Sequence, residues 1–401
     1  MTAPRPILVV LGMMGASPFA GVAWQVLHHI EGFRRLGFDV YYVEDTGTWP
    51  YDPARNAVTG DSDYAVNYIA SMMNWCGLSD RWAYRSTAQA GRVYGLSAAR
   101  FDQVLAEAEI LVNLTASTVL REQHLGIPIR VYLETDPVLP QIKVAQGDAK
   151  TIGILASHTH HFTYGENFGA PDCGVPLVRF HYVPTRPPVV TEWWTRDGQP
   201  DQVTAPASDP DNWAADFTTI ASWAQNGKDF LWQGQLYTWS KHREFLKFLD
   251  LPLLTPQTFE LALARVPADA REALLSHGWR VRDALTLSRD IGPYRDYIME
   301  SRGEFTVAKD QNVRMRSGWF SDRSACYLAA GRPVVTQDTG FGNILPTGEG
   351  LFAFNTMDQI LAAFDAIRSD YSRHSRAARA IAQEYFRAET VLSRLLADLG
   401  L

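Results

Sequence analysis

Residues 316–341 constrain the fold of this 401-residue chain more than any other segment. Their local signals predict, in order, a glycine turn, a helix of small residues, a short buried strand and a polar cluster. A helix that begins beside a glycine turn forms an anion site, because its unsatisfied N–H groups and the positive end of its dipole face the same point. Polar groups just beyond the next strand then lie where a sugar attached to that anion would bind. The four parts are the turn Ser317-Gly318, the helix from Ser321 to Gly331, the strand at 333–335 and the cluster Gln337-Asp338-Thr339-Gly340.

This order of parts resembles the donor-binding half of the GT-B glycosyltransferases. The residues at 317–321 (SGWFS) are similar to that superfamily's His-x-Gly-Trp-Asn-Ser diphosphate loop, and those at 331–335 (GRPVV) to its Gly-x-Pro-Val-Val turn. Gln337-Asp338 is similar to the acidic-amide pair that holds sugar hydroxyls. The resemblance therefore implies that Ser317, Gly318, Ser321, Gln337 and Asp338 bind a nucleotide diphosphate sugar.

Two positions depart from the family pattern. The loop histidine is Arg316 here, and the glutamate expected on the nucleotide ribose is Cys326. Retaining members carry glutamates at the positions of Gly318 and Cys326, and this chain has neither. Recognition of the ribose and the anomeric outcome of the transfer are therefore open.

The residues at 303–309 (GEFTVAK) resemble the Gly-Glu-Phe-Ser/Thr-Val-Ala-Lys run of a group of bacterial glycosyltransferases. Lys309 and Arg316 offer positive charge to a leaving diphosphate, whose developing negative charge must be stabilised. Glu304 either accepts from sugar hydroxyls or holds a basic side chain, and Lys241 is a weaker phosphate candidate. The structural alternative is a solvated Lys309 and an ordinary ion pair.

Length and composition indicate a two-domain enzyme. A chain of 401 residues exceeds what one hydrophobic core usually supports. The net charge of −7 argues against a nucleic-acid partner, which would favour a concentrated basic face. Three cysteines without paired spacing suggest reduced thiols and a cytoplasmic setting. No window is apolar enough for an integral membrane segment.

Apolar runs alternate with helical patterns along the chain, which predicts parallel sheets covered by helices on both faces. We expect an α/β fold of the GT-B type: two Rossmann-like, doubly wound domains that face a cleft, with a C-terminal helix that crosses back to the first domain. The expected domains are 1–185 for the acceptor, 186–378 for the donor with a linker at 186–212, and 379–401 for the crossover helix. The expected strands are 7–11, 39–43, 110–114, 129–133, 151–156, 216–221, 258–263, 279–281, 304–308, 333–336 and 351–354, and the expected helices include 22–36, 357–368 and 375–399.

A glycine-rich loop at 12–21 follows the first expected strand. A dinucleotide fingerprint needs G-x-G-x-x-G with an acid that closes the second strand. Glu44 and Asp45 close that strand, but the glycine spacing is wrong for a nicotinamide enzyme. In GT-B relatives this loop faces the cleft, so the resemblance implies that Gly15 contacts substrate. A tight turn that only glycine permits is the structural alternative.

Carboxylates and imidazoles cluster after two expected strands. Asp136 precedes Pro137, and His160 and Glu166 follow the strand expected at 151–156. Because ligands bind at the carboxyl ends of parallel strands, we expect all three near the site. A transfer that inverts the sugar needs a base for the acceptor hydroxyl. Asp136 is the first candidate for that base and His160 the second, whereas a turn role for Asp136 is the structural alternative.

Two patterns suggest a metal without completing a site. His158 and His160 alternate along an extended segment, but no acid or cysteine completes a ligand set nearby. Asp209-Pro210-Asp211 mimics an Asp-x-Asp motif inside the expected linker. Since GT-B enzymes in general use helix dipoles and basic side chains, we expect neither a metal nor another cofactor.

The sequence therefore predicts a metal-independent glycosyltransferase that uses a UDP-, TDP- or GDP-linked sugar and a small-molecule or glycan acceptor. Two other classes compete with it. A sugar-nucleotide epimerase or a phosphorylase of the same fold would share the diphosphate loop. A non-catalytic nucleotide-sugar-binding module would keep the fold and tolerate loss of Asp136, Glu304 and Lys309.

Overall fold

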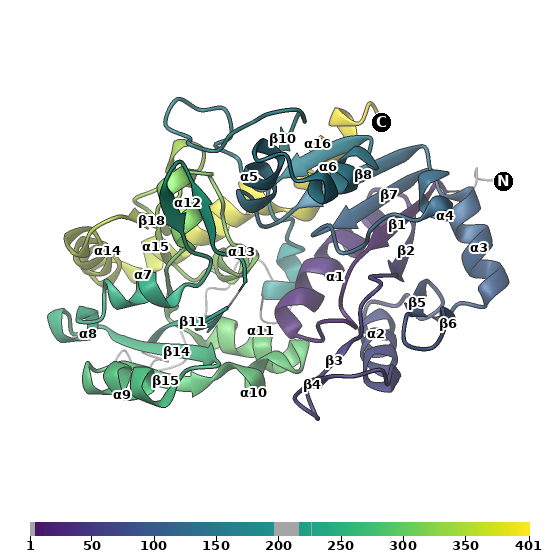
Figure 1. The fold of residues 1–401 in the computed structure, drawn as a ribbon. Coiled ribbons are helices and arrows are strands. Elements are labelled where there is room, and N and C mark those ends of the chain that lie inside the picture. The colour runs from purple at the N-terminus through teal and green to yellow at the C-terminus, as the bar shows by residue number, and fades with distance from the viewer. Residues whose placement is uncertain (1–4, 196–215, 226) are drawn as a thin grey trace.

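The computed structural model describes residues 5–195, 216–225 and 227–401 and has an α/β architecture built on two large sheets (Figure 1). Most of the expected linker at 186–212, including Asp209 and Asp211, lies outside the described residues. The first sheet ends with Val183–Pro184, and the second begins with Asp216–Ser222. The domain boundaries that we expect from the sequence agree with this division in outline and stay predictions.

The first sheet has eight strands in the order β10-β9-β8-β7-β1-β2-β5-β6. All neighbours pair in parallel except β5 and β6. The strands are β1 (Ile7–Leu11), β2 (Asp39–Glu44), β5 (Trp82–Ser86), β6 (Arg92–Gly95), β7 (Ile110–Leu114), β8 (Ile129–Glu134), β9 (His160–Thr163) and β10 (Val183–Pro184). The helices are α1 (Ala20–Arg35), α2 (Asp63–Trp75), α3 (Ala98–Glu107), α4 (Glu122–Leu125), α5 (Leu139–Ala145) and α6 (Ala149–Ala156). A small hairpin of β3 (Tyr51–Asp52) and β4 (Ala57–Val58) and a 3-10 turn, η1 (Thr191–Trp194), complete this part.

The second sheet has six parallel strands in the order β15-β14-β11-β16-β17-β18. These are β11 (Asp216–Ser222), β14 (Thr258–Ala264), β15 (Arg280–Asp283), β16 (Gly303–Thr306), β17 (Val334–Gln337) and β18 (Leu351–Phe354). A separate hairpin joins β12 (Phe230–Trp232) to β13 (Gln235–Tyr237). The helices are α7 (His242–Leu246), α8 (Leu251–Leu254), α9 (Ala268–Ser276), α10 (Ala284–Ser288), α11 (Ile291–Glu300), α12 (Asp310–Met315), α13 (Asp322–Ala329), α14 (Met357–Ser369), α15 (Tyr371–Ile381) and α16 (Ala388–Asp398), with short turns η2 (Phe341–Asn343) and η3 (Ala382–Phe386).

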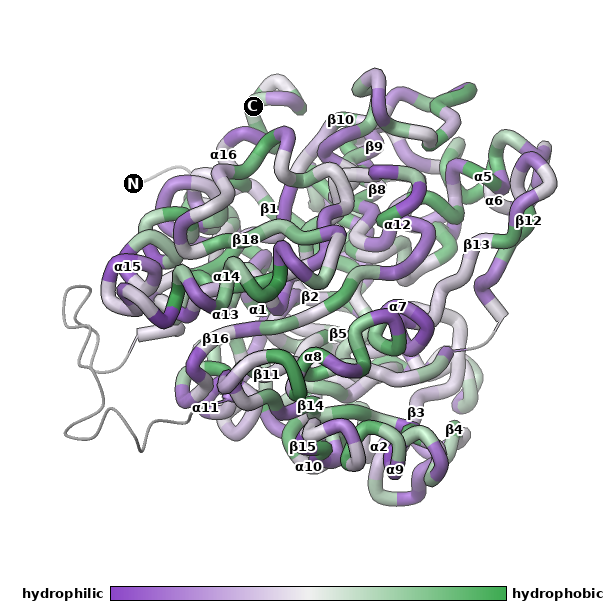
Figure 2. The backbone as a smooth tube through the Cα atoms, turned by 90° about the vertical axis from the view of Figure 1, so that its left-hand side faces the viewer, coloured by the Kyte–Doolittle hydropathy of each residue, from purple (hydrophilic) through white to green (hydrophobic). Residues whose placement is uncertain are grey.

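Continuous apolar runs form the central strands because helices cover both faces of a parallel sheet. Residues Leu8 to Leu11 of β1 are fully buried, and Figure 2 shows β14 as a mainly hydrophobic stretch. In each sheet the strand order reverses beside the first strand, between β1 and β7 and between β11 and β16. Ligands bind outside the carboxyl ends of strands at such points.

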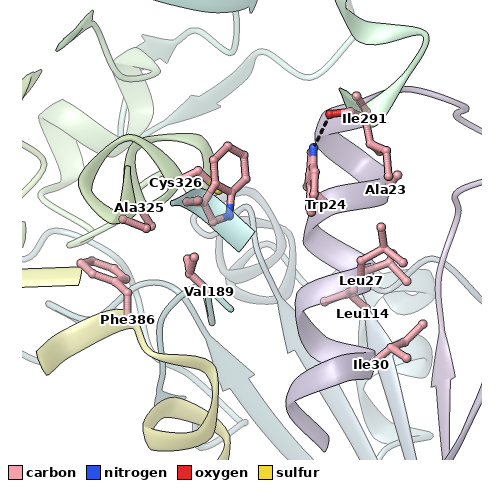
Figure 3. Close-up of a cluster of buried hydrophobic side chains, with 14 of the residues drawn as sticks. Ala23, Trp24, Leu27, Ile30, Leu114, Val189, Ile291, Ala325, Cys326 and Phe386 are labelled. Carbon is pink, nitrogen blue, oxygen red and sulfur yellow. Dashed lines mark hydrogen bonds between the residues drawn. The ribbon is translucent and has the colours of Figure 1, made fainter. Parts of the chain in front are cut away.

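A shared core joins the two sheets (Figure 3). Buried side chains of α1, β7, α11, α13 and η3 pack together, among them Trp24, Leu114, Ile291, Cys326 and Phe386. The Trp24 indole N–H donates to the carbonyl oxygen of Ile291 at 3.2 Å, which ties α1 to α11. The two halves of the chain therefore pack directly on one another.

Two expected elements were wrong. Residues 151–156 belong to helix α6 and not to a strand, because Asp148 accepts from the Thr151 N–H at 2.7 Å and caps the helix. The helix expected at 375–399 is interrupted at Arg387. Val189 hydrogen bonds there with the backbone of Phe386 (2.7 Å) and Ala388 (2.8 Å), which a continuous helix would not permit.

The last helix crosses back to the first sheet, as expected. Helix α16 packs on α1, where a Cβ on Gly32 would lie 2.5 Å from Leu392 Cδ1 and 3.1 Å from Ala388 Cβ. Arg35 of α1 also pairs with Glu389 of α16 at 2.9 Å. The absence of a side chain at Gly32 therefore sets how closely the two helices approach.

Candidate active site

The two sheets meet at a seam, formed by the residues that follow β8 and β9 on one side and β16 and β17 on the other. Three successive residues of the first side bind the second. The Trp319 indole N–H donates to the Thr135 carbonyl at 2.9 Å, and Gln311 Nε2 donates to the Pro137 carbonyl at 3.2 Å. Between them, Lys309 Nζ forms an ion pair with Asp136. The seam therefore holds the turn that carries Asp136 from the opposite half of the chain.

Three cations gather at this point: Lys241, Lys309 and Arg323. Arg323 Nε pairs with the fully buried Glu304 at 2.6 Å, so two of the three cations each have an acid. The Lys241 ammonium group has no hydrogen bond or ion pair with any residue that the structure describes. Its pKa is lowered well below the usual value, first by burial and then by Arg323 and Lys309. An anion bound beside Lys241 would favour its charged form, because Asp136 and Glu304 are already paired with Lys309 and Arg323.

Two tryptophans line the cationic cluster. Lys309 Nζ lies 3.5 Å from the centroid of the Trp239 ring, and Lys228 Nζ lies 4.3 Å from the same ring. Lys241 Nζ lies 5.4 Å from the Trp319 centroid. Aromatic faces attract ammonium groups without supplying a counter-anion, so the two rings help to hold the lysines at the seam.

The start of helix α13 adds backbone donors to the same place. Ser321 is the N-cap residue, and its side chain caps none of the first N–H groups. Those groups have no acceptor within the helix. Asp322 opens the helix, and its pKa is raised to about 6, mainly by burial and against a hydrogen bond from Gln25.

The turn Ser317-Gly318 differs from expectation because its backbone N–H groups are not bare. They donate to the carbonyls of Asn312 (3.2 Å) and Thr339 (2.7 Å). Gly318 has φ 82°, and a Cβ there would lie 2.2 Å from the Asn167 backbone nitrogen. The glycine therefore permits close contact between the two halves of the chain, and this turn offers an anion neither of its two N–H groups.

Three expected sugar or phosphate ligands already have protein partners. Arg316 pairs across the seam with Asp172 at 2.6 Å. It also pairs with Asp338, on its own side, at 3.0 Å. The Gln337 amide accepts from the Ala308 N–H at 3.2 Å and donates to Glu244 at 2.8 Å. These contacts fix the loops around the cations.

Three other expected site residues contact parts of the chain other than the three cations. His160 begins strand β9 and pairs in register with Val131, so it lies toward the amino end of the sheet and not at its carboxyl edge. The error follows from the strand expected at 151–156. Glu166 pairs with Arg186 (Nε to Oε2, 3.0 Å) in a small pocket beside α16. The Gly15 N–H donates to Glu44 at 2.7 Å, and a Cβ there would lie 2.8 Å from Ile69 Cδ1, so the loop packs on α2.

The described residues hold no group of three or more histidines, cysteines or acids placed to share a metal ion. His158 contacts Ile154 and Asn113 through its two ring nitrogens, at 2.9 Å and 3.0 Å. No helix in the described parts of the chain has the length and apolar character to cross a membrane.

Arg323 and Trp239 are the residues at the site that the sequence did not reveal. A signal for Arg323 was present, because an arginine in the first turn of a helix opposes the helix dipole and therefore needs an anionic partner. Trp239 gave no comparable signal, since tryptophans are usually core residues.

No family model matches the sequence. No curated protein matches it either. Solved structures, however, resemble it over nearly its whole length. HepE from Anabaena, solved with UDP and glucose, has a TM-score of 0.55 at 11% identity, covering 99% of this chain and 100% of that chain. The chain has the GT-B fold.

Two further structures with the GT-B fold agree with this assignment. An α-glucosyltransferase solved with UDP-glucose and DNA containing an abasic site has a TM-score of 0.52 at 10% identity, with 98% of each chain covered. AviGT4, a glycosyltransferase involved in avilamycin A biosynthesis, has a TM-score of 0.52 at 12% identity, covering 98% of this chain and 97% of that chain. Identities this low establish the fold alone.

Proposed function

We propose that this protein is a glycosyltransferase that moves a sugar from a nucleoside diphosphate sugar to an acceptor hydroxyl. The observation that carries the proposal is the position of Lys241, whose ammonium group forms no ion pair with a described residue and lies close enough to Lys309 and Arg323 for both to lower its pKa. HepE and the α-glucosyltransferase were solved with UDP and UDP-glucose, both of which contain a diphosphate. The fold and the charge therefore point to the same ligand.

In this proposal the second half of the chain holds the donor. Lys241 and Lys309 contact the diphosphate, and the first N–H groups of α13 donate to it. As the bond between the sugar and the phosphate breaks, negative charge grows on the diphosphate, and preorganised cations stabilise that charge most strongly. Glu304 keeps Arg323 in position through their buried ion pair.

The first half supplies the acceptor side. Asp136 lies at the carboxyl end of β8 with its side chain 45% exposed, so a hydroxyl group has access to it. In an inverting transfer the acceptor oxygen attacks the anomeric carbon, the diphosphate leaves, and Asp136 takes the hydroxyl proton. We propose a small-molecule or glycan acceptor, which the net charge of −7 supports over nucleic acid.

The experiment incubates the protein with UDP-, TDP- and GDP-sugars, with and without a panel of hydroxylated acceptors, and measures release of the nucleoside diphosphate. Release that depends on an acceptor and survives EDTA supports a metal-independent transferase. Donor epimerisation without an acceptor indicates an epimerase, and turnover that requires inorganic phosphate indicates a phosphorylase. Tight binding without any turnover indicates a binding module.

A further inference from the structure

The turn that presents Asp136 is strained. Val138 has φ 91° and ψ −60°, a conformation that a β-branched residue rarely adopts. Such strain persists only where the surroundings enforce it, and it clusters at functional sites. The Val138 side chain is fully buried against Ile142, Phe230 and Tyr237, which fixes one side of the turn.

Besides the contacts across the seam, a side-chain hydrogen bond from within the first half of the chain fixes the backbone of this turn. The Val138 N–H donates to Gln141 Oε1 at 2.8 Å. The opposite end of the same amide, Gln141 Nε2, donates to both carboxylate oxygens of Glu134, at 2.9 Å and 3.1 Å. Thr163 Oγ1 also donates to Glu134, at 2.7 Å. Glutamine and glutamate are both almost completely buried, so water does not substitute for these contacts.

The orientation of the Gln141 amide follows from this arrangement. The Val138 N–H can only donate, so Gln141 must turn its oxygen toward it and its NH₂ group toward Glu134. Burial raises the pKa of Glu134 to about 8, and its carboxyl oxygens accept from Gln141. Reversing the amide would place its NH₂ group against that N–H and leave two buried donors opposed.

We propose that Gln141, oriented by Glu134, is a positioning residue that holds the strained turn and so places the Asp136 carboxylate at the seam. The inference rests on the proposed function, in which Asp136 takes the acceptor proton. Gln141 and Glu134 do not touch substrate. They act through the Val138 backbone.

Exchanging the carboxyl group of Glu134 and the amide group of Gln141 tests whether this pair positions Asp136. In Glu134→Gln one of the two carboxyl oxygens that accept from Gln141 becomes an NH₂ group, which opposes the NH₂ group of Gln141, and Gln141→Glu sets two carboxylates against each other. We expect each single variant to lower kcat by about tenfold to a hundredfold, because a displacement of about 1 Å has effects of that size. The donor KM should not rise, since Lys241 and Lys309 are untouched. The double variant Glu134→Gln with Gln141→Glu restores an acceptor toward Val138 and should recover most of the lost kcat.

Gln146→Glu is the matched control, because it makes the same chemical change at the C-terminal end of the same helix, where the Gln146 side chain donates to the Leu231 carbonyl at 2.9 Å. A purely structural role predicts that both single variants lose melting temperature while kcat per folded molecule stays constant. That result, or a double variant no better than the single ones, would overturn the inference.

A crystal structure of Glu134→Gln tests, independently of activity, whether this pair holds the turn that carries Asp136. We expect the Gln141 side chain to have withdrawn from the Val138 N–H and the Asp136 carboxylate to have moved away from Lys309. An unchanged turn contradicts the inference even in an active enzyme. A wild-type protein that binds no nucleoside diphosphate and transfers no sugar contradicts the proposed function instead, and the test of the turn still stands.

Discussion

At the scale of single residues, the site is defined by which charges are already paired. Asp136 forms an ion pair with Lys309, and Glu304 forms one with Arg323, whereas Lys241 forms no ion pair with a described residue. A diphosphate would therefore bind Lys241 directly and compete with Asp136 for Lys309. The resident ion pair links the candidate base to the donor site, because one lysine serves both.

The ion pair leads to a prediction for Asp136→Asn. Removing this carboxylate ends its competition for Lys309, so affinity for the matching nucleoside diphosphate should rise about threefold to tenfold, or about 0.7–1.4 kcal/mol. Turnover should nevertheless fall by about 10²–10⁴, because the base is lost. Isothermal titration calorimetry and steady-state kinetics measure the two effects.

The control for this prediction is the same change in a Lys309→Met background, where we expect no gain in affinity. Unchanged turnover in a stable Asp136→Asn protein would remove Asp136 from the mechanism. Weaker diphosphate binding in that variant would show that the carboxylate does not compete for Lys309.

At the scale of elements, helix α6 and strand β9 bury a histidine in its neutral form. His158 donates from Nδ1 to Ile154 and accepts at Nε2 from Asn113, an arrangement that a second proton would break. Burial is the main cause that lowers its pKa to about 4 from 6.5. Because the folded value lies below the unfolded one, this contribution to stability is complete above pH 6.5 and is lost as the pH falls toward 4.

We therefore expect the free energy of unfolding to decrease between pH 6.5 and pH 4, and to decrease less in His158→Gln, which has no proton to take up. Urea titrations at several pH values measure this difference. Other buried histidines, His28, His29 and His124, act in the same direction, so some decrease remains in the variant. Identical pH dependence in the two proteins would contradict the account.

Most strands, but not every helix, could be predicted from the sequence. Apolar runs such as β1 and β18 were located closely, because a strand buried on both faces leaves a plain signal. The run at 151–156 was misread because its branched residues favour a strand, while the cap at Asp148 selected a helix. That single error displaced His160 from the expected edge.

The part of the site that the sequence did not reveal depends on contacts between distant segments. Lys309 and Asp136 belong to different sequence motifs, and only the fold shows that they form an ion pair. The partners of Arg316 and Gln337, Asp172 and Glu244, are also far away in the sequence. Local pattern identifies the type of such residues and not their neighbours.

At the scale of the whole molecule, the final helix fastens the two halves of the chain together. Gly32→Ala in α1 should destabilise the protein by about 1–3 kcal/mol, since the new methyl group would overpack Leu392 and Ala388. Gly153→Ala in α6 is the matched control, because no atom lies within 4 Å of its Cβ position. It should stabilise by about 0.4–1 kcal/mol. Chemical denaturation compares the two, and equal effects would contradict the packing of α16 on α1.

The proposed function requires that a nucleoside diphosphate binds at the seam. The most direct test is calorimetry of the wild-type protein and of Lys241→Met with UDP, TDP and GDP and with the corresponding nucleosides. We expect one diphosphate to bind the wild-type protein clearly more tightly than its nucleoside, and we expect Lys241→Met to lose most of that difference while its melting temperature stays close to that of the wild type. Binding of no diphosphate, or equal binding of diphosphate and nucleoside, would contradict the proposed function.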